Sequence, residues 1–164
     1  MGMSTDDMVF TFCSNVVFVP WLALMFAPKW KWTSPITRMV VLISCIIYTF
    51  YFGKHMMNTR DGVVTIFTDM GTLTGLSKLF RDEGMVLPAW VHYLAFDLLA
   101  GHYCVQKNMA DVSPLSKPAM VPILFLHMMA GPMGTLLYVC VRALPDLMDG
   151  NFSKAADKAT EKIS

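Results

Sequence analysis

Apolar residues along the chain gather in four long runs that polar stretches separate. The runs lie at about 8–26, 36–52, 87–105 and 119–141. Each is close to the ~20 residues that an α-helix needs to cross a bilayer. The pattern therefore predicts an all-α integral membrane protein with about four transmembrane helices in one bundle.

The stretch between the second and third runs has a different periodicity. Over about 64–83, apolar residues recur at three- and four-residue spacing, and Thr, Asp, Lys and Arg occupy the other face. This pattern predicts an amphipathic helix that lies on the membrane surface, with Gly71 and Gly75 as weak points. A helix packed against a partner protein fits the same pattern equally well. Residues 1–145 then form one domain, and 146–164 form a polar C-terminal tail.

The composition also favours a bilayer as solvent. Of the 164 residues, 55% are hydrophobic and 15% are charged, and the mean hydropathy is +0.49. Soluble domains usually carry ~25% charged residues. The net charge of +1 and the scattered basic residues give no reason to expect a nucleic-acid partner. We predict a multi-pass protein of a plastid, mitochondrial inner or bacterial inner membrane, and the sequence does not separate these.

The chain ends and the cysteines add two expectations. Four crossings would place both ends of the bundle on the same side of the membrane, and the distribution of Lys and Arg leaves the orientation open. The four cysteines fall inside apolar runs without a CxxC pair, so we expect free thiols packed as small hydrophobic groups and no metal site.

Four ionisable residues lie inside the predicted spans: His92, Asp97, His102 and His127. Ionisable groups are costly within a membrane, so they are candidates for a functional site. On an ideal helix Asp97 is rotated ~140° and His102 ~280° from His92. We therefore expect Asp97 to face the bundle, and His92 and His102 to face lipid, pigment or a partner subunit.

Asp97 and His127 are predicted to meet in the core of the bundle. His127 shares its face with small residues, which permit close approach of helices. The short loop between the third and fourth spans predicts antiparallel neighbours, and this places the two residues within ~3 Å of the same level. Such a pair could act as general acid and base. A hydrogen-bonded pair that only fixes helix packing is the competing interpretation.

His92 and His102 have a second interpretation as cofactor ligands. Histidines on membrane helices ligate haem or chlorophyll in the axial position. Histidines near helix ends also bond water or backbone groups, and the sequence leaves both alternatives open.

Two sequence blocks carry a family resemblance. Residues 90–101 read WVHYLAFDLLAG and residues 131–138 read GPMGTLLY. Together with the N-terminal span containing Asn15 and Trp21, they resemble the ABA4-like family over most of the chain. Plant members are plastid proteins needed to form neoxanthin from violaxanthin. The chain departs from the family at His102, where an Arg is frequent. Its N-terminus does not resemble a plastid presequence, so we expect targeting to be internal or a presequence to lie outside this sequence.

The resemblance implies a function in carotenoid metabolism. The substrate would be a long apolar polyene with epoxide ends, and Asp97 and His127 would supply the acid and base for epoxide-to-allene isomerisation, in an enzyme or an enzyme partner. The alternative is a non-catalytic accessory subunit of a photosynthetic or respiratory membrane complex that binds pigment or lipid. The candidate ligands are thus a carotenoid, chlorophyll or haem.

Overall fold

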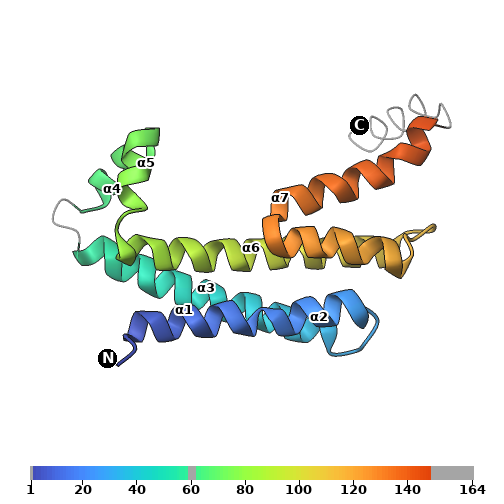
Figure 1. Cartoon of the computed structure of the whole chain (residues 1–164), viewed down its shortest axis with the longest axis horizontal. Helices are drawn as coiled ribbons and strands as arrows, with labels where there is room; N and C mark the ends of the chain where they lie inside the picture. Colours follow the sequence, from blue (N-terminus) through green and yellow to red (C-terminus); the bar gives the residue numbers. More distant parts are fainter. Residues whose placement is uncertain (1, 59–61, 149–164) are drawn as a thin grey trace, which may run out of the picture.

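The computed structural model describes residues 2–58 and 62–148, and within these residues it is built from helices (Figure 1). In chain order the helices are α1 Thr5–Val16, α2 Phe18–Phe26, α3 Thr33–Asn58, α4 Gly62–Met70, α5 Leu73–Leu79, α6 Glu83–Ala110 and α7 Lys117–Met148. Four stretches of the described chain are long and apolar enough to cross a membrane, as predicted: Thr5–Phe26, Thr33–Asn58, Glu83–Ala110 and Lys117–Ala143.

The first of these stretches joins α1 and α2 in one rod (Figure 1). The two helices are separated at Val17, whose backbone stays in the right-handed helical region. Pro20 has no N–H to donate to the carbonyl of Val16 four residues earlier, so the helical ladder is interrupted at this point. The effect of Pro20 is therefore confined to a short interruption of the helix.

Helix α6 is the centre of the bundle, because α1, α2, α3 and α7 all pack against it. Its buried residues consequently lie on several faces, whereas the outer helices bury one face each. The outward side chains are large and apolar, such as Leu42 (60% exposed) and Leu136 (65% exposed). Such a surface suits lipid better than water, because soluble proteins rarely expose extended apolar patches.

The single amphipathic helix predicted over 64–83 is divided in two, and its position at the membrane surface stays a prediction. The segment folds as a hairpin of two short helices, α4 and α5, that stands off one end of α6 (Figure 1). Thr72 begins α5, because its hydroxyl accepts a hydrogen bond from the Gly75 N–H at 3.1 Å. Gly75 packs directly on the backbone of Asp69, where a side chain would not fit. Gly75, noted as a weak point of one helix, is thus the residue that allows the two helices to pack.

The predicted fourth span, about 119–141, falls within α7, but α7 is not one continuous helix. Helix α7 is broken at Ala130, whose backbone is not helical (φ −159°, ψ 81°), two residues before Pro132. Its second half turns back along the first, as Figure 1 shows. Two contacts require this. The His127 imidazole reaches the Thr135 hydroxyl at 3.0 Å, although eight helical residues span ~12 Å. Arg142 bonds Asp111, which lies beside the start of α7.

This fold-back predicts three membrane crossings and a helical hairpin in place of four crossings. Ser113 accepts a hydrogen bond from Arg142, the neighbour of Ala143, at one end of the bundle, and the N-terminus lies at the other end (Figure 1). We expect a membrane-impermeant maleimide to label single cysteines at 113 and 143 from the same side of sealed vesicles, and at 2 from the opposite side, with the native cysteines replaced by serine. Labelling of positions 2 and 143 from one side would instead indicate a continuous fourth crossing.

Candidate functional site

Asp97 lies halfway along α6, level with the break in α7. Its half-buried carboxylate packs on the backbone of Gly131, which is its backbone hydrogen-bonding partner. A Cβ at Gly131 would collide with this carboxylate, so only glycine fits. The second half of α7 starts here with Pro132, a residue suited to the first turn of a helix. Asp97 therefore places a carboxyl group at the positive end of a helix that belongs to another segment.

His127 is completely buried, with 0% of its surface exposed, on the last turn before the break. Its Nδ1 lies 3.1 Å from the Ile123 carbonyl oxygen, so this nitrogen carries the proton that is donated. Its Nε2 faces the Thr135 hydroxyl at 3.0 Å and the Cys104 sulfur at 3.8 Å. Both ring nitrogens thus have partners, and a neutral imidazole accepts at Nε2.

Thr135 connects His127 to the surface of the bundle. Its hydroxyl lies 3.1 Å from the Gly131 carbonyl oxygen, and the residue itself is exposed. When His127 is neutral, the hydroxyl donates to Nε2. When Nε2 carries a proton, the Thr135 hydroxyl accepts a hydrogen bond from it and donates its own hydrogen to the Gly131 carbonyl oxygen. The hydrogen bonds therefore accommodate both protonation states of the imidazole.

The predicted Asp97–His127 pair is close but not in direct contact. The two side chains lie within electrostatic reach of each other, and His92 is also within reach of Asp97. Across the described ranges 2–58 and 62–148, no hydrogen bond or ion pair joins Asp97 to His127. The broken segment from Gly131 to Thr135 lies between them, with Asp97 on one side and His127 on the other.

The sequence interpretation missed the part played by Thr135, Cys104 and Trp21. Thr135 stands eight residues after His127, and the two meet only because α7 folds back. The indole of Trp21 packs against Gly101, which leaves no room there for a Cβ. Gly131, Pro132 and Gly134 are residues that can break a helix. An expected break there would have predicted that Thr135 folds back toward His127.

His102 does not face outward, and that expectation is wrong. Only 6% of its surface is exposed, and its Nε2 lies 3.1 Å from the Ser34 hydroxyl of α3. The ideal-helix estimate assumed that α6 had one outer face, but α3 covers the face that carries His102. Its proposed use as a cofactor ligand would require loss of the bond to Ser34.

His92 lies in the N-terminal half of α6, whereas His102 lies in the C-terminal half, and His92 is half-buried. Its ring contacts Phe96 with a centroid distance of 4.5 Å, and Tyr48 of α3 at 5.6 Å. It borders a cavity of about 230 Å³ beneath the α4–α5 hairpin. A carotenoid, chlorophyll or haem ligand at His92 stays a prediction. Within the part of the chain that the structure describes, no three His, Cys, Asp or Glu side chains cluster as metal ligands.

These features define a class of protein. It is an all-helical protein with four helices long and apolar enough to span a membrane, and it carries an aspartate and a buried histidine on two sides of a broken helix. The chain belongs to the ABA4-like family, because the family model described as ABA DEFICIENT 4-like matches residues 8–138. This range contains every residue of the site described above. A search of curated proteins found no match, and neither did a search of solved structures.

Proposed function

We propose that this chain is an integral membrane protein that takes part in the isomerisation of an epoxy-xanthophyll to a neoxanthin-type allene, as the enzyme or as its partner. The family to which the chain belongs supports a carotenoid-related function. The apolar outer surface supports a bilayer environment, in which such a polyene dissolves. The observation that carries the proposal is the position of Asp97, a half-buried carboxylate in the middle of the apolar bundle.

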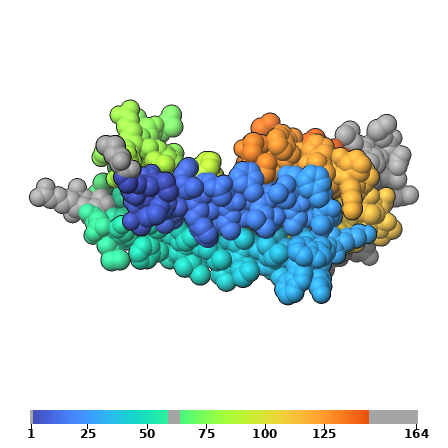
Figure 2. All heavy atoms as spheres, turned by 60° about the horizontal axis from the view of Figure 1, so that its bottom comes forward, coloured from blue at the N-terminus to red at the C-terminus, as the bar shows by residue number. Residues whose placement is uncertain are grey.

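A substrate would approach this carboxylate between the α4–α5 hairpin and α7. Figure 2 shows the notch between these two parts in profile, behind α1. The cavity that His92 and Tyr93 border lies under the hairpin, and Gly131 of α7 packs on Asp97. A long apolar molecule would have to run along and around α6 to reach from the cavity to the carboxylate, because Asp97 is rotated ~140° from His92.

The chemistry requires one proton to be added and one to be removed. A proton is delivered to the epoxide oxygen as its C–O bond breaks, and a proton is lost from a polyene carbon as the allene double bond forms. The overall change is an isomerisation without an oxidant or reductant. Asp97 is placed to exchange a proton with the substrate. His127 exchanges a proton through the Thr135 hydroxyl, because its own ring is sealed in the bundle.

The test is turnover of violaxanthin by the purified protein in lipid vesicles, followed by chromatography of the pigments. We expect a neoxanthin-type product from violaxanthin and no reaction with zeaxanthin, which has no epoxide. Absence of product under every condition, including membranes that supply partner proteins, would contradict the proposal. A stoichiometric complex that co-purifies with the chain, without turnover, would favour the accessory-subunit alternative.

A further inference from the structure

The cavity under the α4–α5 hairpin has a mixed lining that sets it apart from the rest of the bundle. It measures about 230 Å³, and its walls come from α3, α4, α5 and α6. Most of the wall is apolar or aromatic, including Phe52, Leu79 and Phe80. Three side chains with hydrogen-bonding groups also line it: Tyr48, His92 and Tyr93.

These three polar groups have no hydrogen-bonding partner among the described residues. Throughout the described residues, neither the His92 imidazole nor the hydroxyls of Tyr48 and Tyr93 make a hydrogen bond. They differ from the other histidines at mid-bundle, since His102 bonds Ser34 and His127 bonds Ile123. The polar atoms of His92 and Tyr48 are also not fully buried, so a ligand can reach them. In a membrane, where water is scarce, such groups are costly unless a ligand satisfies them.

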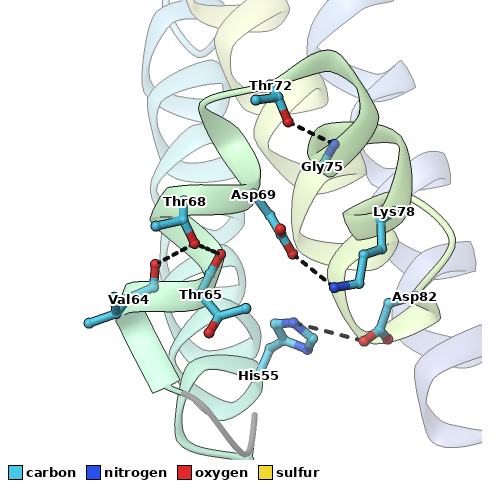
Figure 3. Close-up of polar contacts among 9 residues, drawn as sticks. All are labelled: His55, Val64, Thr65, Thr68, Asp69, Thr72, Gly75, Lys78 and Asp82. Carbon is cyan, nitrogen blue, oxygen red and sulfur yellow. Dashed lines mark hydrogen bonds and ion pairs between the residues drawn. The ribbon is translucent and has the colours of Figure 1, made fainter.

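The shape of the cavity is defined by the fold, because contacts hold the α4–α5 hairpin that covers it in place. Figure 3 shows the polar contacts at its base. Asp69 of α4 pairs with Lys78 of α5 at 3.4 Å, and Asp82 at the start of α6 pairs with His55 of α3 at 4.0 Å. Ile66, Leu79 and Met85 form a small apolar core under the hairpin. The wall formed by α5 is thus fixed to both α3 and α6.

We propose that this cavity binds an apolar ring that carries an oxygen substituent, with His92 as the hydrogen-bonding partner of that oxygen. A dry cavity of ~150 Å³ accommodates a benzene ring. About 230 Å³ therefore has room for a six-membered ring with a few methyl groups, and not for a long polyene. The aromatic walls pack on the ring faces, and the rest of the ligand leaves through the open side.

The position of the cavity relative to Asp97 gives it a role in the reaction. His92 and Asp97 are five residues apart on α6, which is ~7.5 Å along the axis. Asp97 is also rotated ~140° from His92, so the chain attached to a ring beside His92 would have to run along and around α6 to reach the carboxylate. This last step rests on the proposed function, whereas binding of the ring does not.

The experiment is an NMR titration of the protein in lipid nanodiscs, with ¹⁵N-labelled histidine. The chain has four histidines, so the imidazole resonances are few and His92 can be assigned from a His92→Phe variant. The two probes are 3,3,5-trimethylcyclohexanol and its hydrocarbon counterpart, 1,1,3-trimethylcyclohexane. We expect both to shift the His92 resonances, and the alcohol to bind about two- to tenfold more tightly because it adds one hydrogen bond. The resonances of His102 and His127 serve as internal controls and should not move.

Two variants separate the hydrogen bond from the cavity. His92→Phe keeps an aromatic ring but has no ring nitrogen, so the preference for the alcohol should vanish while hydrocarbon binding, followed on labelled Tyr48, persists. Ala89→Phe places a ring in the cavity and should abolish binding of both probes, whereas Ala110→Phe, exposed at the far end of α6, should not. Equal affinity of the two probes for the wild type would overturn the proposal. So would an unchanged preference in His92→Phe, or equal shifts at all four histidines. These results do not depend on turnover, so they can fail or succeed independently of the proposed isomerisation.

Discussion

Asp97→Asn is expected to lower xanthophyll isomerisation about 100- to 10,000-fold, the usual contribution of a positioned general acid or base. The amide has nearly the same shape as the carboxylate, and its oxygen still accepts a hydrogen bond from the Gly131 backbone. It cannot exchange a proton at neutral pH. The measurement is the rate of product formation from violaxanthin in vesicles, compared at equal amounts of folded protein.

The same variant tests the competing interpretation of Asp97 as a structural residue. Asparagine and aspartate stabilise a helix N-terminus about equally well, so a purely structural role predicts a stable and active variant. Full turnover by a stable Asp97→Asn protein would rule out the acid–base role. Glu83→Gln is the matched control, because it removes an exposed carboxylate from the first turn of the same helix. We expect that control to retain its activity.

Gly134→Val is expected to destabilise the fold-back of α7 by about 1–3 kcal/mol, the typical cost of overpacking a tight contact. A Cβ at position 134 would collide with both the ring and the backbone of His127. The two halves of α7 would have to separate, and the contact between His127 and Thr135 would be lost. The measurements are the unfolding temperature in detergent and the rate of isomerisation, and we expect both to be lower than in the wild type.

Gly53→Val is the matched control for this substitution. Gly53 lies in α3, and nothing within 4 Å would meet an added Cβ. The two variants make the same change of side chain inside a helix, but only position 134 is crowded. If both variants unfolded at the same temperature as the wild type, close packing of His127 on Gly134 would not be what holds the fold-back together.

The candidate site was partly predictable. Residues on the apolar helices could be ranked by their cost in a membrane, and this ranking selected Asp97 and His127 from the sequence. Their level in the bundle also follows from the short loop between α6 and α7, because antiparallel neighbours of known rise must bring these positions side by side. The environment of each residue was less predictable. Whether His102 faces lipid depends on the position of α3, and the spacing of residues along α6 does not determine that position.

The α4–α5 hairpin was also predictable only in part. The alternation of apolar and polar residues over 64–83 indicated helix correctly, but a helix and a hairpin of two helices share that periodicity. The choice was made by the contact of Gly75 with the Asp69 backbone and by the Thr72 cap, both of which exist only after the chain has turned.

By itself the sequence determined the class of protein: the helical content, the four apolar stretches, the family and the costly residues within those stretches. These follow from hydrophobicity and from 3.6-residue periodicity, which are local properties. Only the tertiary structure decided that α7 doubles back at Ala130, that Thr135 completes the surroundings of His127, and that His92 lines a cavity while His102 is buried. The physical reason is that the break at Ala130, two residues before Pro132, permits many angles between the two halves of α7. The angle adopted is selected by contacts between distant residues, such as Asp97 on Gly131 and Arg142 on Asp111.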